Sequence, residues 1–246
     1  MYRVESIGLA ALLALGIGVT QAAPPLDPAR AASVRLWDAV ELQISRLRGE
    51  LGFAQLSPPV RQALEQVPRH LFVPESQRPQ AYENRPLPIG YGQTISQPLI
   101  VALMTELLDV GPGDRVFELG TGSGYQAAVL DALGCQVYSV EIIPELARSA
   151  SAVLEAQGYD DVETRIGDGY FGWPEAAPFD AIIVTAASDH IPPPLVQQLR
   201  PGGRMLIPVG GRYATQQLVL VTRDEQGLVT TREITPVRFV PLTGQR

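Results

Sequence analysis

Lysine is absent from this chain of 246 residues, so all 19 of its basic residues are arginines. This absence excludes enzymes that form a Schiff base through a lysine and the P-loop nucleotide hydrolases, whose motif places a lysine on the phosphates. Cysteine and histidine are also scarce, with only Cys135, His70 and His190. We therefore expect no zinc site built from these residue types, and one cysteine cannot form a disulfide within the chain.

Clusters of positive charge are lacking as well. The formal net charge is -7, and no run of arginines interrupts the sequence. Binding to nucleic acid needs clustered basic residues, so we expect no nucleic-acid partner. Hydrophobic residues make up 46% of the chain. That content supports a substantial core and, at this length, one large α/β domain or two small ones.

The N-terminus has the composition of an export signal. Arg3 precedes an apolar run of 13 residues from Ile7 to Val19, which is short for a bilayer span of about 20 residues. Thr20-Gln21-Ala22 then resembles a cleavage site with small residues. We expect residues 1–22 to be a signal peptide of a periplasmic or secreted protein with no stable membrane span. A retained anchor, or a cytoplasmic location, is the alternative.

A helical extension is expected next, over residues 23–60. Its main helix runs from about residue 28 to residue 48, and a break follows at 49–59. One broad apolar face is expected for this helix, formed by Val34, Trp37, Val40, Leu42 and Ile44. A short helix at 60–66 follows the break.

Residues 68–98 are rich in Pro, Gly and Gln, which predicts a long irregular segment. Such segments in compact proteins are usually functional or disordered. Apolar anchors within this one favour an ordered, functional segment.

From residue 98 onward, helical and strand patterns alternate. The order predicts a doubly wound, mostly parallel α/β sheet that ends in an antiparallel strand pair. The expected strands are 115–119, 136–141, 162–166, 179–185 and 204–209, followed by 216–222 and 229–239; the expected helices are 98–108, 125–133, 144–157 and 194–199. In such a sheet, ligands bind at the carboxyl ends of the strands, here the first, second and fourth.

A glycine-rich turn follows the first of these strands, in Val116–Tyr125. Glycines permit a ligand to approach the main chain, and the helix that follows presents free N–H groups. Glu141 ends the second strand, where a carboxylate can accept both hydroxyls of a ribose. Asp168, between two glycines after the third strand, can accept from an adenine amino group or can simply form a turn.

The spacing of the glycines distinguishes between cofactors. A dinucleotide fingerprint reads G-x-G-x-x-G, whereas here Gly120, Gly122 and Gly124 alternate. Glu118 directly precedes the turn, and its carboxylate would repel a pyrophosphate. A ligand with an amino group, a sulfonium and no phosphate suits this position, which points to S-adenosylmethionine.

At this point the sequence resembles the protein-L-isoaspartate O-methyltransferases. The resemblance extends over roughly residues 50–243, and its most specific block is Leu87–Pro98, Leu-Pro-Ile-Gly-Tyr-Gly-Gln-Thr-Ile-Ser-Gln-Pro. Further matching blocks are Glu118–Gln126, Val137–Glu141, Gly167–Gly169, Pro178–Ala187 and Leu199–Gly210. The resemblance implies a Rossmann-like methyltransferase domain over 61–246, with 68–98 on the substrate side. It also implies methyl transfer from S-adenosylmethionine to the free carboxylate of L-isoaspartyl residues in damaged proteins and peptides. We expect the protein to be a monomer.

The resemblance further implies Ser96 as the active-site residue, with Thr94 and Ile95 beside it on the substrate side. Thr243, near the C-terminus, would close the site. Together with the residues derived above, the predicted cofactor site comprises Glu118, Gly120, Thr121, Gly122, Ser123, Gly124, Glu141, Asp168, Gly169 and Thr243.

Other interpretations stay open at this point. A Rossmann oxidoreductase of the NAD type would share the fold and Glu141, but the chain lacks its glycine spacing. A non-catalytic binding protein could retain the same fold. Ser96 could also serve only as the cap of the helix that begins near Pro98, and His190 could lie on a surface loop or touch the substrate.

Overall fold

The structure is a computed structural model that describes residues 27–211 and 214–244. The predicted signal peptide, residues 1–22, lies outside the described residues. Within the described ranges, no helix combines the length and the apolar character needed to cross a bilayer.

One sheet of seven strands organises the chain, in the order β5-β4-β3-β6-β7-β8-β9. Neighbours from β5 to β7 run parallel, and the last two pairings are antiparallel. The predicted fold class is therefore confirmed. The strands are β3 (Arg115–Leu119), β4 (Gln136–Glu141), β5 (Val162–Ile166), β6 (Phe179–Val184), β7 (Leu199–Val209), β8 (Gln216–Arg223) and β9 (Val229–Val237).

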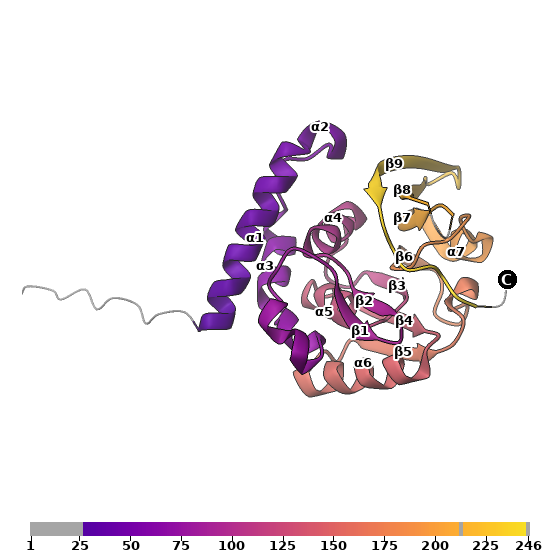
Figure 1. Ribbon diagram of the computed structural model, residues 1–246. Coiled ribbons are helices and arrows are strands. Elements are labelled where there is room, and N and C mark those ends of the chain that lie inside the picture. Colours follow the sequence, from indigo (N-terminus) through magenta and orange to yellow (C-terminus); the bar gives the residue numbers. More distant parts are fainter. Residues whose placement is uncertain (1–26, 212–213, 245–246) are drawn as a thin grey trace, which may run out of the picture.

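Helices cover both faces of this sheet. Figure 1 shows α3, α4 and α5 on one face and α7 on the other. Alternate residues of β3 enter the two cores: Val116 packs with the first group of helices, and Phe117 packs on the opposite face with Phe179 and Leu195. The helices of these layers are α3 (Pro58–Gln66), α4 (Pro98–Leu108), α5 (Tyr125–Ala132), α6 (Pro144–Gln157) and α7 (Pro193–Gln198).

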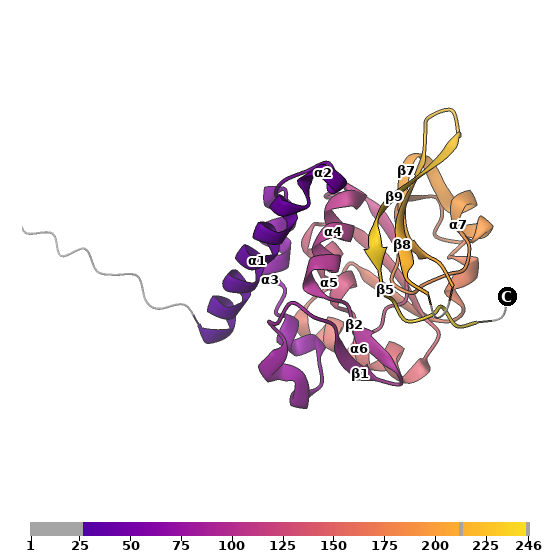
Figure 2. The same ribbon diagram turned by 45° about the horizontal axis from the view of Figure 1, so that its top comes forward.

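The N-terminal extension forms a further helical layer. Its helix α1 (Pro28–Arg46) packs against α3 and α4, and Figures 1 and 2 show it on their outer side. The break expected at residues 49–59 begins later than predicted, because a second short helix, α2 (Arg48–Leu51), follows α1. Leu42 is 56% exposed, so its assignment to the apolar face was wrong. Only two residues beyond buried Val40, it points to nearly the opposite side of the helix.

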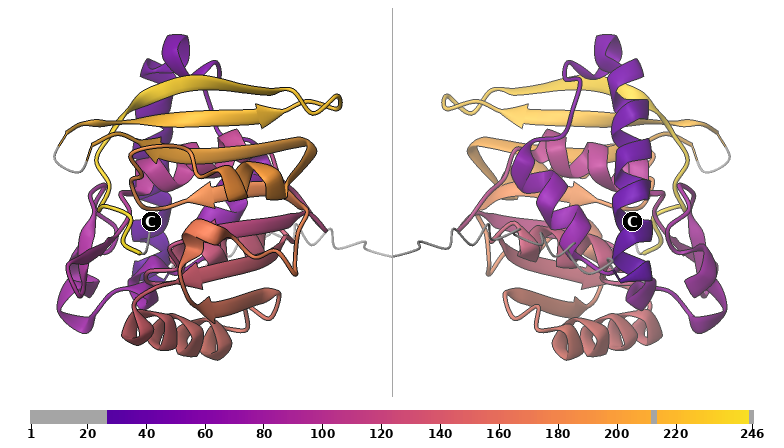
Figure 3. Two further views of the ribbon diagram at one scale, coloured as in Figure 1. Left: turned by 90° about the vertical axis from the view of Figure 1, so that its right-hand side faces the viewer. Right: turned by 90° about the vertical axis from the view of Figure 1, so that its left-hand side faces the viewer.

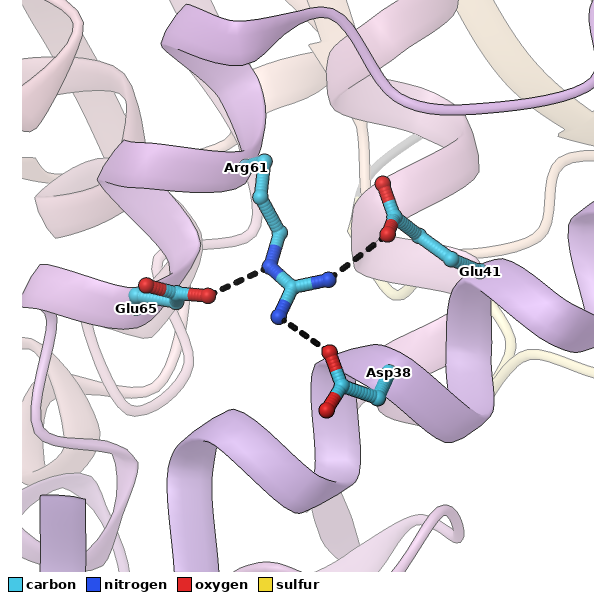
Figure 4. Close-up of polar contacts among 4 residues, drawn as sticks. All are labelled: Asp38, Glu41, Arg61 and Glu65. Carbon is cyan, nitrogen blue, oxygen red and sulfur yellow. Dashed lines mark hydrogen bonds and ion pairs between the residues drawn. The ribbon is translucent and has the colours of Figure 1, made fainter. Parts of the chain in front are cut away.

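A cluster of charges joins α1 to α3 (Figure 4). The Arg61 guanidinium donates to Asp38 and Glu41 of α1, each at 2.7 Å, and to Glu65 of its own helix at 2.6 Å. The three acceptors use different nitrogens of one planar group. Arg61 therefore holds two helices together outside the sheet.

The segment 68–98 is ordered, but it is not irregular throughout as predicted. It contains two short 3₁₀ helices, η1 (Arg69–Phe72) and η2 (Glu75–Gln80). An antiparallel hairpin follows, formed by β1 (Leu87–Gly90) and β2 (Gln93–Ile95). Strands of four and three residues are too short for a period-of-two pattern to stand out. Figure 3 shows this segment on the same side of the sheet as the chain after β9.

Candidate active site

A cavity opens where the predicted crevice was expected, at the carboxyl ends of β3, β4 and β6. Its walls come from residues 118–123, 140–143 and 185–186. Residues 93–96, at the end of β2, form a further wall, and residues 240–243 of the C-terminal segment complete it. The topology thus brings five stretches of sequence to one edge of the sheet.

The glycine turn after β3 requires backbone conformations that other residues rarely adopt. Gly120 has a φ of 99° and Gly122 a φ of 54°, both in the left-handed region. A Cβ on Gly120 would also fall on the Thr185 hydroxyl. That hydroxyl donates to the carbonyls of Leu119 at 2.9 Å and Gly120 at 2.6 Å, which fixes the turn to the end of β6.

Glu118 lies beneath this turn and is fully buried. It pairs in register with Ser139 of β4, whose hydroxyl is hydrogen-bonded to Oε2 of Glu118 and, at 2.6 Å, to the hydroxyl of Thr121. The other carboxyl oxygen, Oε1, is buried without a partner among the described residues. Burial is the main cause that raises the pKa of Glu118 to about 8; the bond to Ser139 opposes the rise, and the nearby Glu141 adds to it.

Glu141, at the end of β4, holds the same turn from the other side. Its Oε2 accepts from the N–H of Gly122 at 2.8 Å, and its Oε1 accepts from the N–H of Ile143 at 3.0 Å. Each carboxylate oxygen has a second lone pair. The side chain can therefore support the turn and still accept hydrogen bonds from a ligand.

The remaining predicted cofactor residues divide into two groups. Four of them line the cavity together with the residues already described: Thr121, Ser123, Gly169 and Thr243. The other two, Gly124 and Asp168, are not part of its lining. Gly124 faces α6, where a Cβ would approach Leu154 closely. The Asp168 carboxylate accepts from the N–H of Tyr170 at 3.0 Å and lies against Gly244.

The C-terminal segment is fastened across the top of the cavity. The N–H of Leu242 donates to the carbonyl of Ala187 at 2.7 Å, and the N–H of Ala187 donates to that of Val240 at 2.8 Å. These bonds place Thr243 at the cavity wall.

Thr94, Ile95 and Ser96 all line the cavity, and Thr94 and Ser96 also line a second cavity beside it. Thr185 and Val240 are shared in the same way, so the two cavities have a common border. The interpretation of Ser96 as a helix cap is wrong, because Gln97 occupies the N-cap position of α4, and the Leu99 N–H of the first turn donates to Asn84 Oδ1 at 3.0 Å rather than to Ser96.

Several residues that line or support the cavity are missing from the prediction. Ser139 had a detectable signal, since it precedes Glu141 by two residues and so faces the same side of an otherwise apolar strand. Thr185 directly follows the apolar run Ala181–Val184 of β6, and this position marks the carboxyl end of the strand. Tyr125 and Gln126 begin α5, and the Gln126 amide donates to Thr105 of α4 at 3.0 Å. Helix–helix contacts of this kind have no sequence signature.

His190 is not among the residues that line the main cavity. It is half-exposed, and its ring nitrogens contact Tyr170 at 2.9 Å and Asp189 at 2.6 Å. His70 contacts the hydroxyl of Tyr82 at 2.8 Å, and the pKa of its imidazole is lowered, mainly by burial.

The charge of the main cavity limits what it can bind. Among the described residues that line it, Glu118 and Glu141 are acidic and none is basic. Without a basic partner, these two acidic groups offer no counter-charge to a phosphate group. They favour a cationic or amino-bearing ligand, which would also favour the ionised form of Glu118 despite its raised pKa.

An open α/β sheet with a glycine turn and an acidic strand end defines a protein that binds a nucleoside-type cofactor at the carboxyl edge of the sheet. The family model of protein-L-isoaspartate(D-aspartate) O-methyltransferase matches residues 43–246, and the chain belongs to this family. It is 56% identical over 233 residues to protein-L-isoaspartate O-methyltransferase 1 of Cupriavidus necator, covering 95% of this chain and 89% of the relative. It is 57% identical over 232 residues to protein-L-isoaspartate O-methyltransferase 2 of Syntrophobacter fumaroxidans, covering 94% and 93%.

Solved structures give the same result. A protein-L-isoaspartate O-methyltransferase matches with a TM-score of 0.70 and 29% identity, over 83% of this chain and 66% of that one. A putative protein-L-isoaspartate O-methyltransferase from Plasmodium falciparum, solved with S-adenosyl-L-homocysteine, matches with a TM-score of 0.69 and 25% identity, over 84% and 98%.

The raised pKa of Glu118 predicts a pH-dependent stability. The pKa of this carboxyl group rises from 4.5 to about 8 on folding, so between these pH values the folded protein binds a proton that the unfolded chain does not. The free energy of unfolding is therefore highest below pH 4.5, and it falls as the pH rises to about 8. Glu118→Gln removes this titration. In the ligand-free protein, we expect the unfolding free energy of Glu118→Gln, measured relative to that of the wild type, to increase by roughly 1 kcal/mol for each pH unit between pH 5 and 8.

Urea unfolding at several pH values measures this difference. The exposed Glu163 of β5 provides the matched control, and Glu163→Gln should retain the pH dependence of the wild type. Parallel curves for the wild type and Glu118→Gln would show that Glu118 does not titrate in this range.

Proposed function

We propose that this chain transfers a methyl group from S-adenosylmethionine to the free carboxylate of L-isoaspartyl residues in damaged proteins and peptides. One observation carries the proposal: a cavity with two acidic side chains and no basic one borders a second cavity at Thr94 and Ser96. The first suits a cationic cofactor, and the second provides room for a polypeptide. Family membership supports the same reaction.

The cavity residues fit the proposed cofactor. The unpartnered Oε1 of Glu118 suits an amino group, and the free lone pairs of Glu141 suit the hydroxyls of a ribose. We assign Asp168 to the adenine amino group, at the rim beside Gly244. When bound, S-adenosylmethionine supplies a methyl group on its sulfonium.

The acceptor makes modest chemical demands. A free carboxylate has a reference pKa near 4 and is an anion at neutral pH, so it needs no general base. The protein's task is to align a carboxylate oxygen with the methyl group, and positioning of this kind supplies much of a rate enhancement. We assign it to the hydroxyls of Ser96 and Thr94, with Ile95 beside them.

We assign this activity to a methyltransferase domain over residues 61–246, with residues 68–98 on its substrate side and residues 23–60 as a helical extension. The substrate partner is a polypeptide that carries an isoaspartyl residue. An NAD-type oxidoreductase is disfavoured because a pyrophosphate would meet the two acidic residues of the cavity without a basic one.

Cofactor binding tests the position of the pocket. Gly122→Val should abolish binding of S-adenosylmethionine, because a β-branched residue is strained at a φ of 54° and its side chain would occupy ligand space. Isothermal titration with S-adenosylmethionine and with NAD measures this directly. Gly158, with a φ of 74° and open space around it at the end of α6, is the matched control. Gly158→Val should retain binding, and unchanged affinity in Gly122→Val would remove the pocket from this position.

Ser96→Ala tests the substrate side. A hydrogen bond to a charged group contributes about 1.5–3 kcal/mol. At about 1.4 kcal/mol per decade, kcat/KM should fall ten- to a hundredfold while cofactor affinity stays nearly unchanged. Methyl transfer to an isoaspartyl peptide, with the matching aspartyl peptide as blank, provides the measurement. Ser45→Ala is the control, because Ser45 is a partly exposed residue of α1 that does not line either cavity. Unchanged kinetics in Ser96→Ala would shift the assignment to Thr94 and the neighbouring backbone amides.

The location of the protein is a separate proposal. We infer that residues 1–22 are removed on export, so that the mature chain begins near Ala23 in the periplasm or medium. N-terminal sequencing of the protein from its native host should find this start. An intact Met1 on cytoplasmic protein would contradict export, and the proposed activity would stand.

A further inference from the structure

A fully buried arginine, Arg69, lies behind the substrate-side wall of the cavity. It begins η1, and its guanidinium donates to two backbone carbonyls. Nε donates to Ala81 at 3.0 Å, and Nη2 donates to Ser96 at 2.7 Å. The side chain thus connects the start of the segment 68–98 to the residue at the border of the two cavities.

The same guanidinium also contacts the cofactor side of the site. Its Cζ lies 5.0 Å from the centre of the Tyr125 ring, a distance at which a cation is attracted to the ring face. Tyr125 is the first residue of α5, directly after the glycine turn, and it lines the main cavity. Arg69 therefore contacts both the Ser96 backbone and the helix that begins at the glycine turn.

This arrangement is energetically expensive. Arg69 forms no ion pair with any residue in the described ranges, and its Nη1 is buried without a hydrogen-bond partner among them. Burial lowers the pKa of the guanidinium to about 10, which leaves it charged at neutral pH. Because an apolar side chain often fills such a space at lower cost, a role in stability alone explains the arginine poorly.

We propose that Arg69 is a positioning residue for methyl transfer, which sets the orientation of Ser96 by holding its carbonyl. This inference rests on the function proposed above for Ser96. The peptide group between Ser96 and Gln97 is planar. Fixing its oxygen fixes the ψ angle of Ser96, and with it the direction of the side chain relative to α4.

Holding the carbonyl matters because α4 does not fix Ser96 by itself. The helix begins at Pro98, and its N-cap, Gln97, forms no side-chain capping bond. Ser96 is only half-buried and borders both cavities. A misplacement of about 1 Å can reduce a rate by a factor of 100, so the anchor on its backbone should be visible in the kinetics.

The experiment compares Arg69→Lys and Arg69→Met with Arg61→Met in the otherwise complete chain. Arg61 is the matched control, because its guanidinium also makes three contacts but lies between α1 and α3. Rates of methyl transfer to an isoaspartyl peptide are divided by the number of S-adenosylmethionine sites titrated, so that unfolded protein does not count. Thermal midpoints are recorded in parallel.

We expect kcat per cofactor site to fall ten- to a hundredfold in Arg69→Met and three- to tenfold in Arg69→Lys, which keeps the charge but has a single nitrogen to donate from. Cofactor affinity should stay within twofold. Arg61→Met should lower the thermal midpoint and leave kcat within twofold of the wild type. If Arg69→Met does not fold, Arg69→Lys decides alone.

A double-mutant cycle tests whether Arg69 acts through Ser96. If it does, Ser96→Ala/Arg69→Lys should be no more than twofold slower than Ser96→Ala, because linked residues are not additive. The proposal would be overturned if the double variant showed the product of the two separate decreases in kcat. An unchanged kcat per site in both Arg69 variants would also overturn it.

Hydrogen exchange separates this inference from the proposed function. The amides of Leu99 and Ile100, which donate to Asn84 Oδ1 at 3.0 Å and to the Gln97 carbonyl at 2.9 Å, report on the backbone that follows Ser96. Their protection should drop in Arg69→Lys and persist in Arg61→Met. If the wild type binds cofactor but does not methylate the peptide, the proposed function fails, and so does the part of the inference that concerns methyl transfer. Unchanged exchange in Arg69→Lys would also overturn the anchoring itself.

Discussion

The buried carboxyl group of Glu118 is the constraint on which the arrangement of the site depends. It lies in the middle of the sheet, where water cannot solvate it, and its neighbours on β4 and in the glycine turn are arranged around it. Ser139 can reach it only because the two strands pair in register, and Thr121 contacts Ser139 only because the turn folds back over β4. A shift of one residue in that register would place Ser139 on the opposite face.

Glu118 also couples ligand binding to the stability of the fold. A buried acidic group with one unpartnered oxygen weakens the ligand-free fold, and a cationic ligand that pairs with it removes that penalty. The left-handed backbone of Gly120 and the two bonds from Thr185 also serve the site, since each keeps the main chain where a ligand can approach it. Local rules of stability are broken here in favour of a site.

Much of the sheet could be predicted from the sequence because its central strands carry apolar runs between clear turn signals. Phe179–Val184 is buried on both faces, and such a run has few alternatives to a central parallel strand. The hairpin at 87–95 and the exposure of Leu42 could not be predicted in the same way. The hairpin strands are too short to show a period, and a broad apolar pattern on α1 does not reveal on which side α3 and α4 pack.

The residues of the site also divide into those that the sequence predicts and those that it does not. Residues adjacent in sequence to the glycine turn, and the acidic end of β4, were predictable because the topology requires strand ends to meet. Tyr125 and Gln126 directly follow the turn but were missed, because they look like ordinary helix residues. Arg69 reaches the site through tertiary packing, since 26 residues separate it from Ser96 in the sequence. Only the packed chain brings them together.

The path of the chain after β9 separates folding from function. All seven strands and nearly all of the buried core precede Arg238, whereas residues 240–243 form part of the cavity wall. They are fastened mainly by backbone bonds to Ala187, which is already in place at the end of β6. A protease that clipped the chain just after Val237 would therefore leave a folded sheet with an open site, and a nascent chain would complete its scaffold before its binding cavity.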